Sequence, residues 1–328
     1  MDPSTSSVRR TRWRARWLMG EYGWALLAIA LACLMVGAAV WVQQSWQQDV
    51  ATETSRVTDV AAQDVARYVE QLDLILQTVM VGDRTPASQT LTADQRNTLL
   101  FERTPRDRYI EFIDVLDANG SVLATLTPDK PATSWARRDY FAAQHDSTTN
   151  GLLIGWPFSI EHENGVGFTV SRRITTNDGK FAGVVVLGIR LAFFRDQFSR
   201  YDLREGESLT LLRNDSTVLL RLPFDVRAIG HPVEPASPFD AFARAEQPPY
   251  IARDKTDHIE RRYVFHRVGT LPLIVSIATP VEDRFLSPVL WWALPGILVL
   301  GALCVVLMRQ LLERHQVAPR KARDHVEP

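Results

Sequence analysis

Cysteine and lysine are both scarce in this chain of 328 residues. The two cysteines, Cys33 and Cys304, lie inside long apolar stretches, so the middle of the chain has neither a disulfide nor a cysteine metal site. Arginine outnumbers lysine 33 to 4, yet no basic tract occurs in the middle of the chain. Together with a net charge of −1, this distribution argues against nucleic-acid binding.

Sequence motifs of catalysis are also missing. The chain has no G-x-S-x-G, no Walker A and no H-E-x-x-H pattern, and His162-Glu163 is not followed by a second histidine at the required spacing. The acidic residues and histidines between positions 257 and 266 are best explained as solvent-facing groups of a hairpin. We therefore expect a protein that is not an enzyme and that needs no cofactor and no metal ion.

Two stretches without any charged residue, 22–48 and 285–308, are long enough to cross a membrane. The first follows five arginines and the second precedes a basic tail, so both termini are predicted to be cytoplasmic. A cleaved signal peptide is the alternative for the first stretch, but that stretch is too long and ends in bulky residues. We predict a basic cytoplasmic N-terminus at 1–22, membrane helices at 23–43 and 286–308, a short cytoplasmic tail at 309–328, and a periplasmic region over about 44–285 in a bacterial inner membrane.

A stalk helix is predicted over 44–82. Apolar residues recur there at spacings of three and four from Val50 to Val79, and no proline or glycine interrupts them before Gly82. The seam that they form needs a partner, which is its own domain, a second copy of the chain, or both. We expect a homodimer through this helix, with Val57 and Ala61 at the contact.

Beyond the stalk the hydrophobic period changes to that of strands. Asn-Gly and Asp-Gly turns join several strand-like segments, which predicts a five-stranded antiparallel meander interrupted by one helix. A smaller set of strands and one helix follows. The fold class is therefore α+β, a long N-terminal helix followed by two antiparallel-sheet modules. The first module is expected to have strands at 109–116, 121–126, 152–160, 167–174 and 181–189 and helices at 92–103 and 136–144; the second has strands at 207–213, 217–221, 259–268 and 271–278 and a helix at 239–246.

Five short segments in this order carry a resemblance to a known family. They are VLDANG (115–120), RDYF (138–141), LIGWP (153–157), SRRI (171–174) and GKFAGVV (179–185). Together, over about 45–285 and both flanking helices, the chain resembles the double Cache (PDC-fold) extracytoplasmic sensor domain of bacterial membrane-bound diguanylate cyclases and related receptors. The resemblance implies two PAS-like modules: a membrane-distal one at 83–203 that binds a small ligand, and a membrane-proximal one at 204–284 that relays the change.

The resemblance has one clear departure. No GGDEF motif, histidine-kinase core or coiled-coil signalling hairpin occurs up to Pro328. The first expectation is a signal-transduction sensor that acts through its membrane helices on a separate cytoplasmic output protein. Two alternatives stay open: an ectodomain that docks a periplasmic partner without any ligand, and a truncated diguanylate cyclase or chemoreceptor.

Candidate ligand-binding residues cluster around the helix expected to cover the sheet. Arg138 offers a planar fork for a carboxylate or phosphate, and Tyr140 offers a hydroxyl, so a small anionic ligand is expected. The amino-acid-binding members of the family carry Arg-x-Trp-Tyr, whereas this chain has RDYF, so amino-acid specificity does not carry over. The candidates are Arg138, Asp139, Tyr140, Trp156 and Arg172.

Two of these candidates have a second interpretation. Arg172 is in phase with Phe168 and Val170 on its strand, where a charge needs a partner. That partner is either an anionic ligand or an internal acid such as Asp139, which would make a structural clamp of Arg138, Asp139 and Arg172. Trp156 either lines the pocket or packs in the core, and core packing is favoured.

Overall fold

The computed structural model describes residues 5–281 apart from positions 86–87, 89, 103, 105–106, 128–134, 161–164, 247, 249 and 255–257, together with residues 301, 305 and 309. The chain divides into two compact units. One consists of residues 52–281, and the other consists of residues 1–51 with 282–328. Both sheets lie in the unit formed by 52–281.

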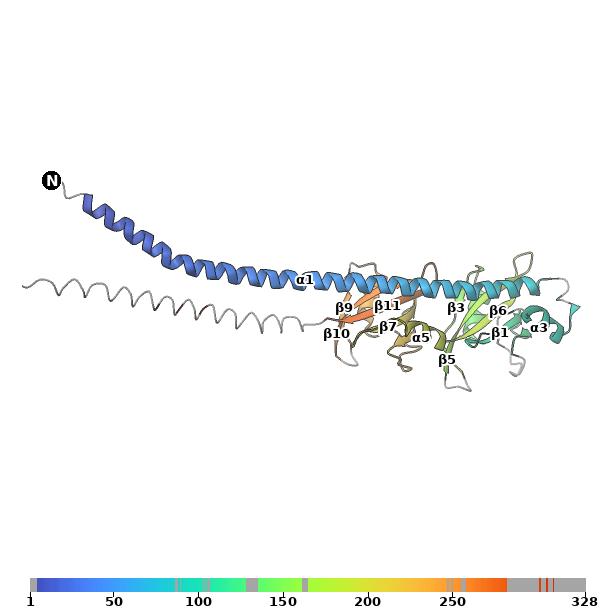
Figure 1. The fold of residues 1–328 in the computed structure, drawn as a ribbon. Coiled ribbons are helices and arrows are strands. Elements are labelled where there is room, and N and C mark those ends of the chain that lie inside the picture. Colours follow the sequence, from blue (N-terminus) through green and yellow to red (C-terminus); the bar gives the residue numbers. More distant parts are fainter. Residues whose placement is uncertain are drawn as a thin grey trace, which may run out of the picture. The chain divides into compact units, whose positions relative to one another are not determined.

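Helix α1 (Thr5–Asp83) is a single helix of 79 residues that runs through the predicted first membrane segment and the predicted stalk (Figure 1). Within the described part of the chain, no helix combines the length and hydropathy that a membrane span requires. The predicted second span at 286–308 lies outside the described residues except for Gly301 and Val305. Both spans therefore stay predictions.

The apolar seam of α1 packs on the protein's own sheets. Val65, Leu72 and Leu76 are buried in one hydrophobic core with strands of both modules. Ala61 is 0 % exposed and belongs to the same core, so the expectation that it faces a second copy is wrong. Val57 is half-buried against this core. The seam is used inside one chain because the sheets supply the apolar partner that it needs.

The distal module is an antiparallel sheet, as the strand pattern predicted, but it has six strands rather than five, and they are not ordered as a meander. The order is β2-β1-β6-β5-β3, with β4 also paired to β5. Strand β6 is central because residues 183–189 are buried on both faces, which is typical of an inner strand. The elements are α3 (Ala93–Phe101), β1 (Ile110–Asp117), β2 (Val122–Thr125), α4 (Asp139–Asp146), β3 (Leu153–Ile154), β4 (Phe158–Ile160), β5 (Gly165–Thr175), β6 (Phe181–Arg190) and α5 (Ala192–Phe198).

The two faces of the distal sheet have different covers. Along β5, Phe168 and Val170 join the core that contains α1. The alternate residue Ser171 accepts a hydrogen bond from Gln144 of α4, because successive side chains of a strand point to opposite faces. The sheet therefore has an α1 face and an α4 face.

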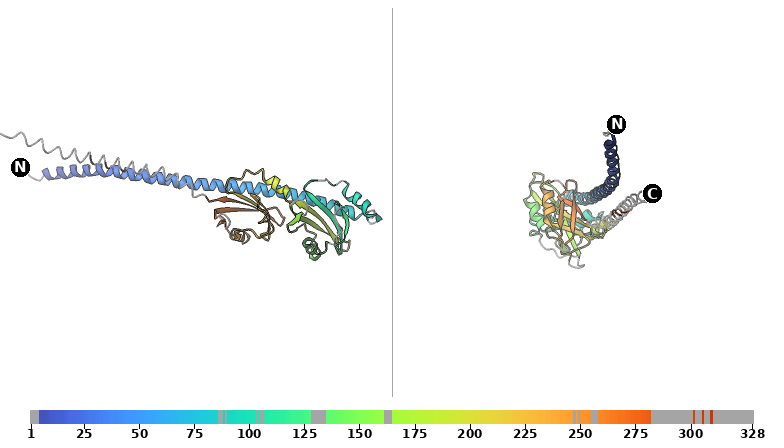
Figure 2. Two further views of the ribbon diagram at one scale, coloured as in Figure 1. Left: turned by 90° about the horizontal axis from the view of Figure 1, so that it is seen from below. Right: turned by 90° about the vertical axis from the view of Figure 1, so that its left-hand side faces the viewer.

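The proximal module is a five-stranded antiparallel sheet in the order β8-β7-β11-β10-β9. Phe239, Phe242, Tyr250 and Phe265 fill one of its faces with aromatic rings in mutual contact. Both sheets lie along α1 (Figure 2), with which they share one core. The elements are β7 (Ser208–Arg213), β8 (Val218–Leu222), α6 (Ala236–Ala243), β9 (Tyr250–Arg253), β10 (Glu260–Arg267) and β11 (Leu273–Pro280). Strand β9 of this module and helix α5 of the distal module were not predicted from the sequence.

Candidate functional site

The α4 face of the distal sheet carries the candidate site. Tyr140 and Phe141 of α4 are buried there in one apolar cluster with Phe112 and Leu116 of β1. Gly188 on the neighbouring strand β6 has no side chain, and a Cβ at this position would collide with the Phe112 ring. The glycine therefore allows an aromatic ring to lie directly against the sheet.

Three polar side chains are buried beside this apolar cluster. Tyr140 and Thr169 are each 3 % exposed, and neither the Tyr140 Oη atom nor the Thr169 Oγ1 atom has a hydrogen-bond partner among the described residues. Asp114, 5 % exposed, lies on β1 in phase with Phe112 and Leu116. Because buried polar atoms are nearly always hydrogen-bonded, two such hydroxyls without a partner among the described residues make this face a candidate binding site.

The electrostatics of Tyr140 keep its hydroxyl protonated. Burial raises the pKa of Tyr140 far above its ordinary value, and the nearby Asp114 carboxylate raises it further. A protonated phenol can donate one hydrogen bond and accept others. The site therefore offers a neutral hydroxyl next to a carboxylate.

Asp139 and Gly155 lie at one end of the same face. The Gly155 N–H donates to the Thr169 carbonyl oxygen at 2.7 Å, and a Cβ on Gly155 would collide with Thr169 Oγ1. The same hypothetical Cβ would lie 3.3 Å from Asp139 Oδ2. Glycine is therefore needed where the chain passes close to Thr169 and Asp139, directly before Trp156.

Arg138 lies at the rim of the site. Its guanidinium is 4.9 Å from the centre of the Trp135 indole, and Trp135 in turn stacks on Phe112 with ring centroids 6.3 Å apart. Arg138 is exposed, and among the described residues no acidic side chain forms an ion pair with it. Its guanidinium can therefore meet an anionic group that approaches from solvent.

Arg172 lies on the α1 face, opposite Tyr140. Its Nε and Nη2 atoms donate to the two carboxylate oxygens of Asp73 on α1, the second at 2.8 Å, and its Nη1 atom donates to the Asn150 carbonyl oxygen at 2.7 Å. The hydrogen bond to Asp73 raises the pKa of the Arg172 guanidinium. The structure thus gives Arg172 an internal acid as its partner, but this acid is Asp73 rather than Asp139.

Trp156 is not a core residue, which corrects the favoured interpretation of its ring. It is 48 % exposed and lies in the three-residue segment between β3 and β4. Its backbone N–H donates to Asp139 Oδ2 at 2.8 Å. The aromatic residues that pack at the site are instead Phe112, Trp135 and Phe158. Of the five predicted residues, the structure brings Asp139 and Tyr140 to the buried polar group, with Arg138 at its rim.

Asp114 and Thr169 were not predicted from the sequence. A signal for Asp114 was present, because a single carboxylate stands in the otherwise apolar strand IEFIDVL in phase with two large apolar residues. Thr169 gave no comparable signal, since threonine is common in strands. Thr169 belongs to the site because Gly155 packs closely against it, and this contact forms only in the folded domain.

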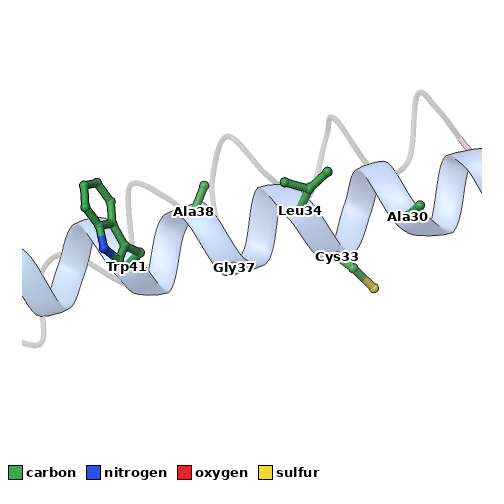
Figure 3. Close-up of a pocket in the computed structure, with 6 residues that line it drawn as sticks. All are labelled: Ala30, Cys33, Leu34, Gly37, Ala38 and Trp41. Atoms are coloured by element: carbon green, nitrogen blue, oxygen red, sulfur yellow. The ribbon is translucent and has the colours of Figure 1, made fainter.

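Other features of the described residues are less suited to recognition. The described part of the chain contains no group of histidine, cysteine and acidic side chains placed to hold a metal ion. An apolar hollow runs along α1 (Figure 3), where small residues such as Gly37 and Ala38 alternate with larger ones. It lies within the predicted first membrane helix and carries no charged side chain. Its lining is Ala30, Cys33, Leu34, Gly37, Ala38 and Trp41.

No model of a known protein family matches the chain, and no curated protein is similar to it by sequence. Solved structures do match. The extracellular domain of a candidate histidine kinase, rpHK1S-Z16, superposes with a TM-score of 0.57 and 24 % identity, covering 74 % of this chain and 98 % of that one.

Two chemoreceptor domains match with similar coverage. The ligand-binding domain of Pseudomonas aeruginosa PctB in complex with L-Arg has a TM-score of 0.56 at 14 % identity, covering 71 % of this chain and 96 % of its own. The corresponding domain of Pseudomonas fluorescens CtaA with L-isoleucine has a TM-score of 0.55 at 14 % identity, covering 75 % of this chain and 98 % of that domain. The chain therefore has the double Cache fold, which it shares with these extracellular and ligand-binding domains.

Proposed function

We propose that this protein is a membrane-anchored sensor whose distal module binds a small molecule between α4 and the sheet. The observation that carries the proposal is the pair of buried hydroxyl oxygens, Tyr140 Oη and Thr169 Oγ1, that have no hydrogen-bond partner among the described residues. An apolar cluster with a few convergent polar groups is the usual composition of a small-molecule site. The chain is proposed to transduce a signal rather than to catalyse a reaction.

The charges around the site favour a ligand that carries both an ammonium and a carboxylate group. Asp114 provides a buried carboxylate for the ammonium group, and Arg138 provides a guanidinium at the rim for the carboxylate. A purely anionic ligand is less well supported, because Arg172 is engaged by Asp73 on the other face. The neighbours were solved with L-Arg, L-isoleucine and, for a Pseudomonas aeruginosa chemoreceptor, GABA, so an amino acid is the ligand class that we propose.

Thermal unfolding of the full chain in detergent tests this proposal. The probes are L-arginine, L-isoleucine, L-alanine and GABA, together with butyrate and butylamine, which each lack one of the two charged groups of GABA. A ligand present at ~100 times its Kd stabilises by about 2.7 kcal/mol. For a domain of this size we therefore expect the melting temperature to rise by about 5–10 °C with at least one amino acid.

The control compounds decide which groups are recognised. Butyrate and butylamine at the same concentration are expected to leave the melting temperature unchanged, because each lacks one of the two charged groups that the site is proposed to recognise. A response to butyrate equal to that of the amino acids would contradict the role of Asp114. An unchanged melting temperature across all six compounds at millimolar concentration would contradict ligand sensing and support an ectodomain that docks a protein partner.

The proposed location is the periplasm of a bacterium, with the spans at 23–43 and 286–308 anchoring the chain in the inner membrane. The support is the distribution of basic residues around the two apolar stretches and the extracellular origin of the structural neighbours. A change in the distal module would then reach a cytoplasmic output protein through these membrane helices.

A homodimer through α1 is proposed to use the outward face of the helix. Val60, Leu74 and Val81 are exposed there by 48 %, 62 % and 68 %, although all three are large apolar residues. They are separated by 14 and 7 residues, which are whole heptads, so they lie on one stripe of the helix. A parallel pair of helices would bury this stripe against its own copy.

Disulfide cross-linking in membranes measures this contact. In a background with Cys33→Ser and Cys304→Ser, Val60→Cys and Leu74→Cys are expected to form dimers under mild oxidation, because a parallel pair places each residue opposite itself. Ala61→Cys is the matched control, since its side chain is buried in the chain's own core. Absence of dimers for both exposed positions, or equal cross-linking of Ala61→Cys, would overturn the proposed interface.

A further inference from the structure

Trp156 connects the distal module to the proximal module. Its half-exposed indole lies under the guanidinium of Arg213, with 5.1 Å from the Arg213 Cζ atom to the ring centroid. Arg213 is the last residue of β7, and it is paired with Leu273 of β11. The contact therefore joins the segment between β3 and β4 to two neighbouring strands of the other sheet.

On the distal side, Trp156 is fixed to the candidate binding site. Its backbone N–H donates to Asp139 Oδ2 at 2.8 Å, and Asp139 is the first residue of α4. Tyr140, whose buried hydroxyl belongs to the proposed site, is the next residue in the same turn. A shift of this turn therefore moves the acceptor that holds Trp156.

On the proximal side, the guanidinium of Arg213 is held in part by its contact with the indole of Trp156. Its Nη2 atom lies 3.1 Å from Asp215 Oδ2, whereas its Nη1 atom is buried and has no hydrogen-bond partner among the described residues. A buried N–H without an acceptor is unfavourable, and the face of an aromatic ring offsets part of that cost. Moving the indole away removes the cation–π contact of the Arg213 guanidinium, so the position of Arg213 is sensitive to that of Trp156.

We propose that the contact between Trp156 and Arg213 couples the occupancy of the distal site to the proximal sheet. This inference rests on the proposed function for its ligand, but the mechanical link from Asp139 through Trp156 to Arg213 exists without one. A ligand that contacts Tyr140 and Asp114 displaces the first turn of α4, and Asp139 carries the Trp156 backbone with it. The displacement then reaches β7 and β11, and β11 is the last strand before the predicted second membrane helix.

Phe224 provides a matched control for Trp156. It is also 48 % exposed, and its ring lies 5.8 Å from the Cζ atom of Arg195, which belongs to α5 of the distal module. This second aromatic–arginine pair joins the same two modules, but among the described residues it has no hydrogen bond to α4. Removal of Phe224 therefore removes a contact of the same kind outside the proposed route.

Hydrogen–deuterium exchange of the ligand-free full chain tests the mechanical link first. We expect Asp139→Ala and Trp156→Ala each to accelerate exchange about fivefold at the end of β7 and in the facing part of β11, the size expected for loss of one such contact. The double variant should add little to either single change, because both interrupt the same link. Unchanged exchange in β7 and β11 with Asp139→Ala, or the same acceleration with Phe224→Ala, would overturn the coupling, whatever the ligand is.

The second measurement repeats the exchange experiment with the amino acid that stabilises the unmodified chain. Ligand is expected to change exchange in α4 and in β7 and β11 of the unmodified protein and of Phe224→Ala. In Trp156→Ala the change in α4 should persist and the change in β7 and β11 should be lost. Persistence of the β7 and β11 response in Trp156→Ala would refute the coupling while leaving ligand binding intact. If none of the six compounds stabilises the unmodified chain, the proposed ligand class fails, and the ligand-free measurement alone decides on the link.

Discussion

Replacing Arg172 by alanine is expected to lower the free energy of unfolding by about 3 kcal/mol. The side chains of Arg172 and Asp73 are only 22 % and 17 % exposed, so the variant leaves a largely buried carboxylate without its partner and also frees the Asn150 carbonyl oxygen. The total free energy of unfolding of such a domain is about 5–15 kcal/mol. Chemical and thermal unfolding should therefore show a clear loss, with a melting temperature lower by about 6–12 °C.

Two further variants show whether the ion pair is the cause. Arg67→Ala removes an arginine from an exposed pair with Asp64, whose side chains are 71 % and 43 % exposed, and should cost less than about 1 kcal/mol. The double variant of Asp73→Ala and Arg172→Ala should lose less than the sum of the two single losses, because both remove one interaction. A loss for Arg172→Ala as small as that for Arg67→Ala would contradict a stabilising pair between α1 and the sheet.

Replacing Asp114 by asparagine is expected to weaken binding of the stabilising amino acid by about 100-fold or more. The substitution keeps the shape of the side chain but removes the charge proposed to face the ligand's ammonium group. Isothermal titration calorimetry on the full chain measures the loss. Glu70→Gln is a suitable control, because Glu70 is an exposed acid on α1 and is not part of the candidate site. Equal affinities for Asp114→Asn and for the control would exclude a direct contact.

Tyr140→Phe should separate binding from stability. The hydroxyl is buried and has no partner in the described residues, so its removal is expected to raise the ligand-free free energy of unfolding by about 1 kcal/mol. The same change should reduce ligand affinity about tenfold, since a hydrogen bond to the ligand is lost. A variant that is less stable than the original protein would show that the hydroxyl is already satisfied inside the module.

The strands could be predicted because their signals are local. The turn around Asp178 and Gly179 and the apolar run after it define β5, β6 and their hairpin, which the structure confirms. The order of the strands could not be derived in the same way. Strand β1 pairs with β6, which is far away in sequence, and this pairing depends on which strands bury both faces. The short edge strand β9, with only four residues, is too brief for a periodic signal.

At the candidate site too, local patterns could be predicted from the sequence, whereas contacts between distant segments could not. The phase of Arg172 with Phe168 and Val170 predicted an internal or ligand partner, and a partner does exist. That partner is Asp73, which lies 99 residues away on a helix whose packing face a strand pattern does not define. For Trp156, residue type alone favoured burial, whereas its neighbours Gly155 and Pro157 place it in a connection whose exposure depends on the other module.

The hydrophobic core that α1 shares with both sheets has a consequence for engineering hybrid receptors. Ala61, Val65, Leu76 and their neighbours belong to a core that also contains Phe168 of one sheet and Leu209 of the other. A chimera that exchanged only the distal module would place a foreign sheet against a helix surface shaped for this one. The smallest segment that can be transplanted between receptors is therefore the continuous block 52–281, in which the helix and both sheets travel together.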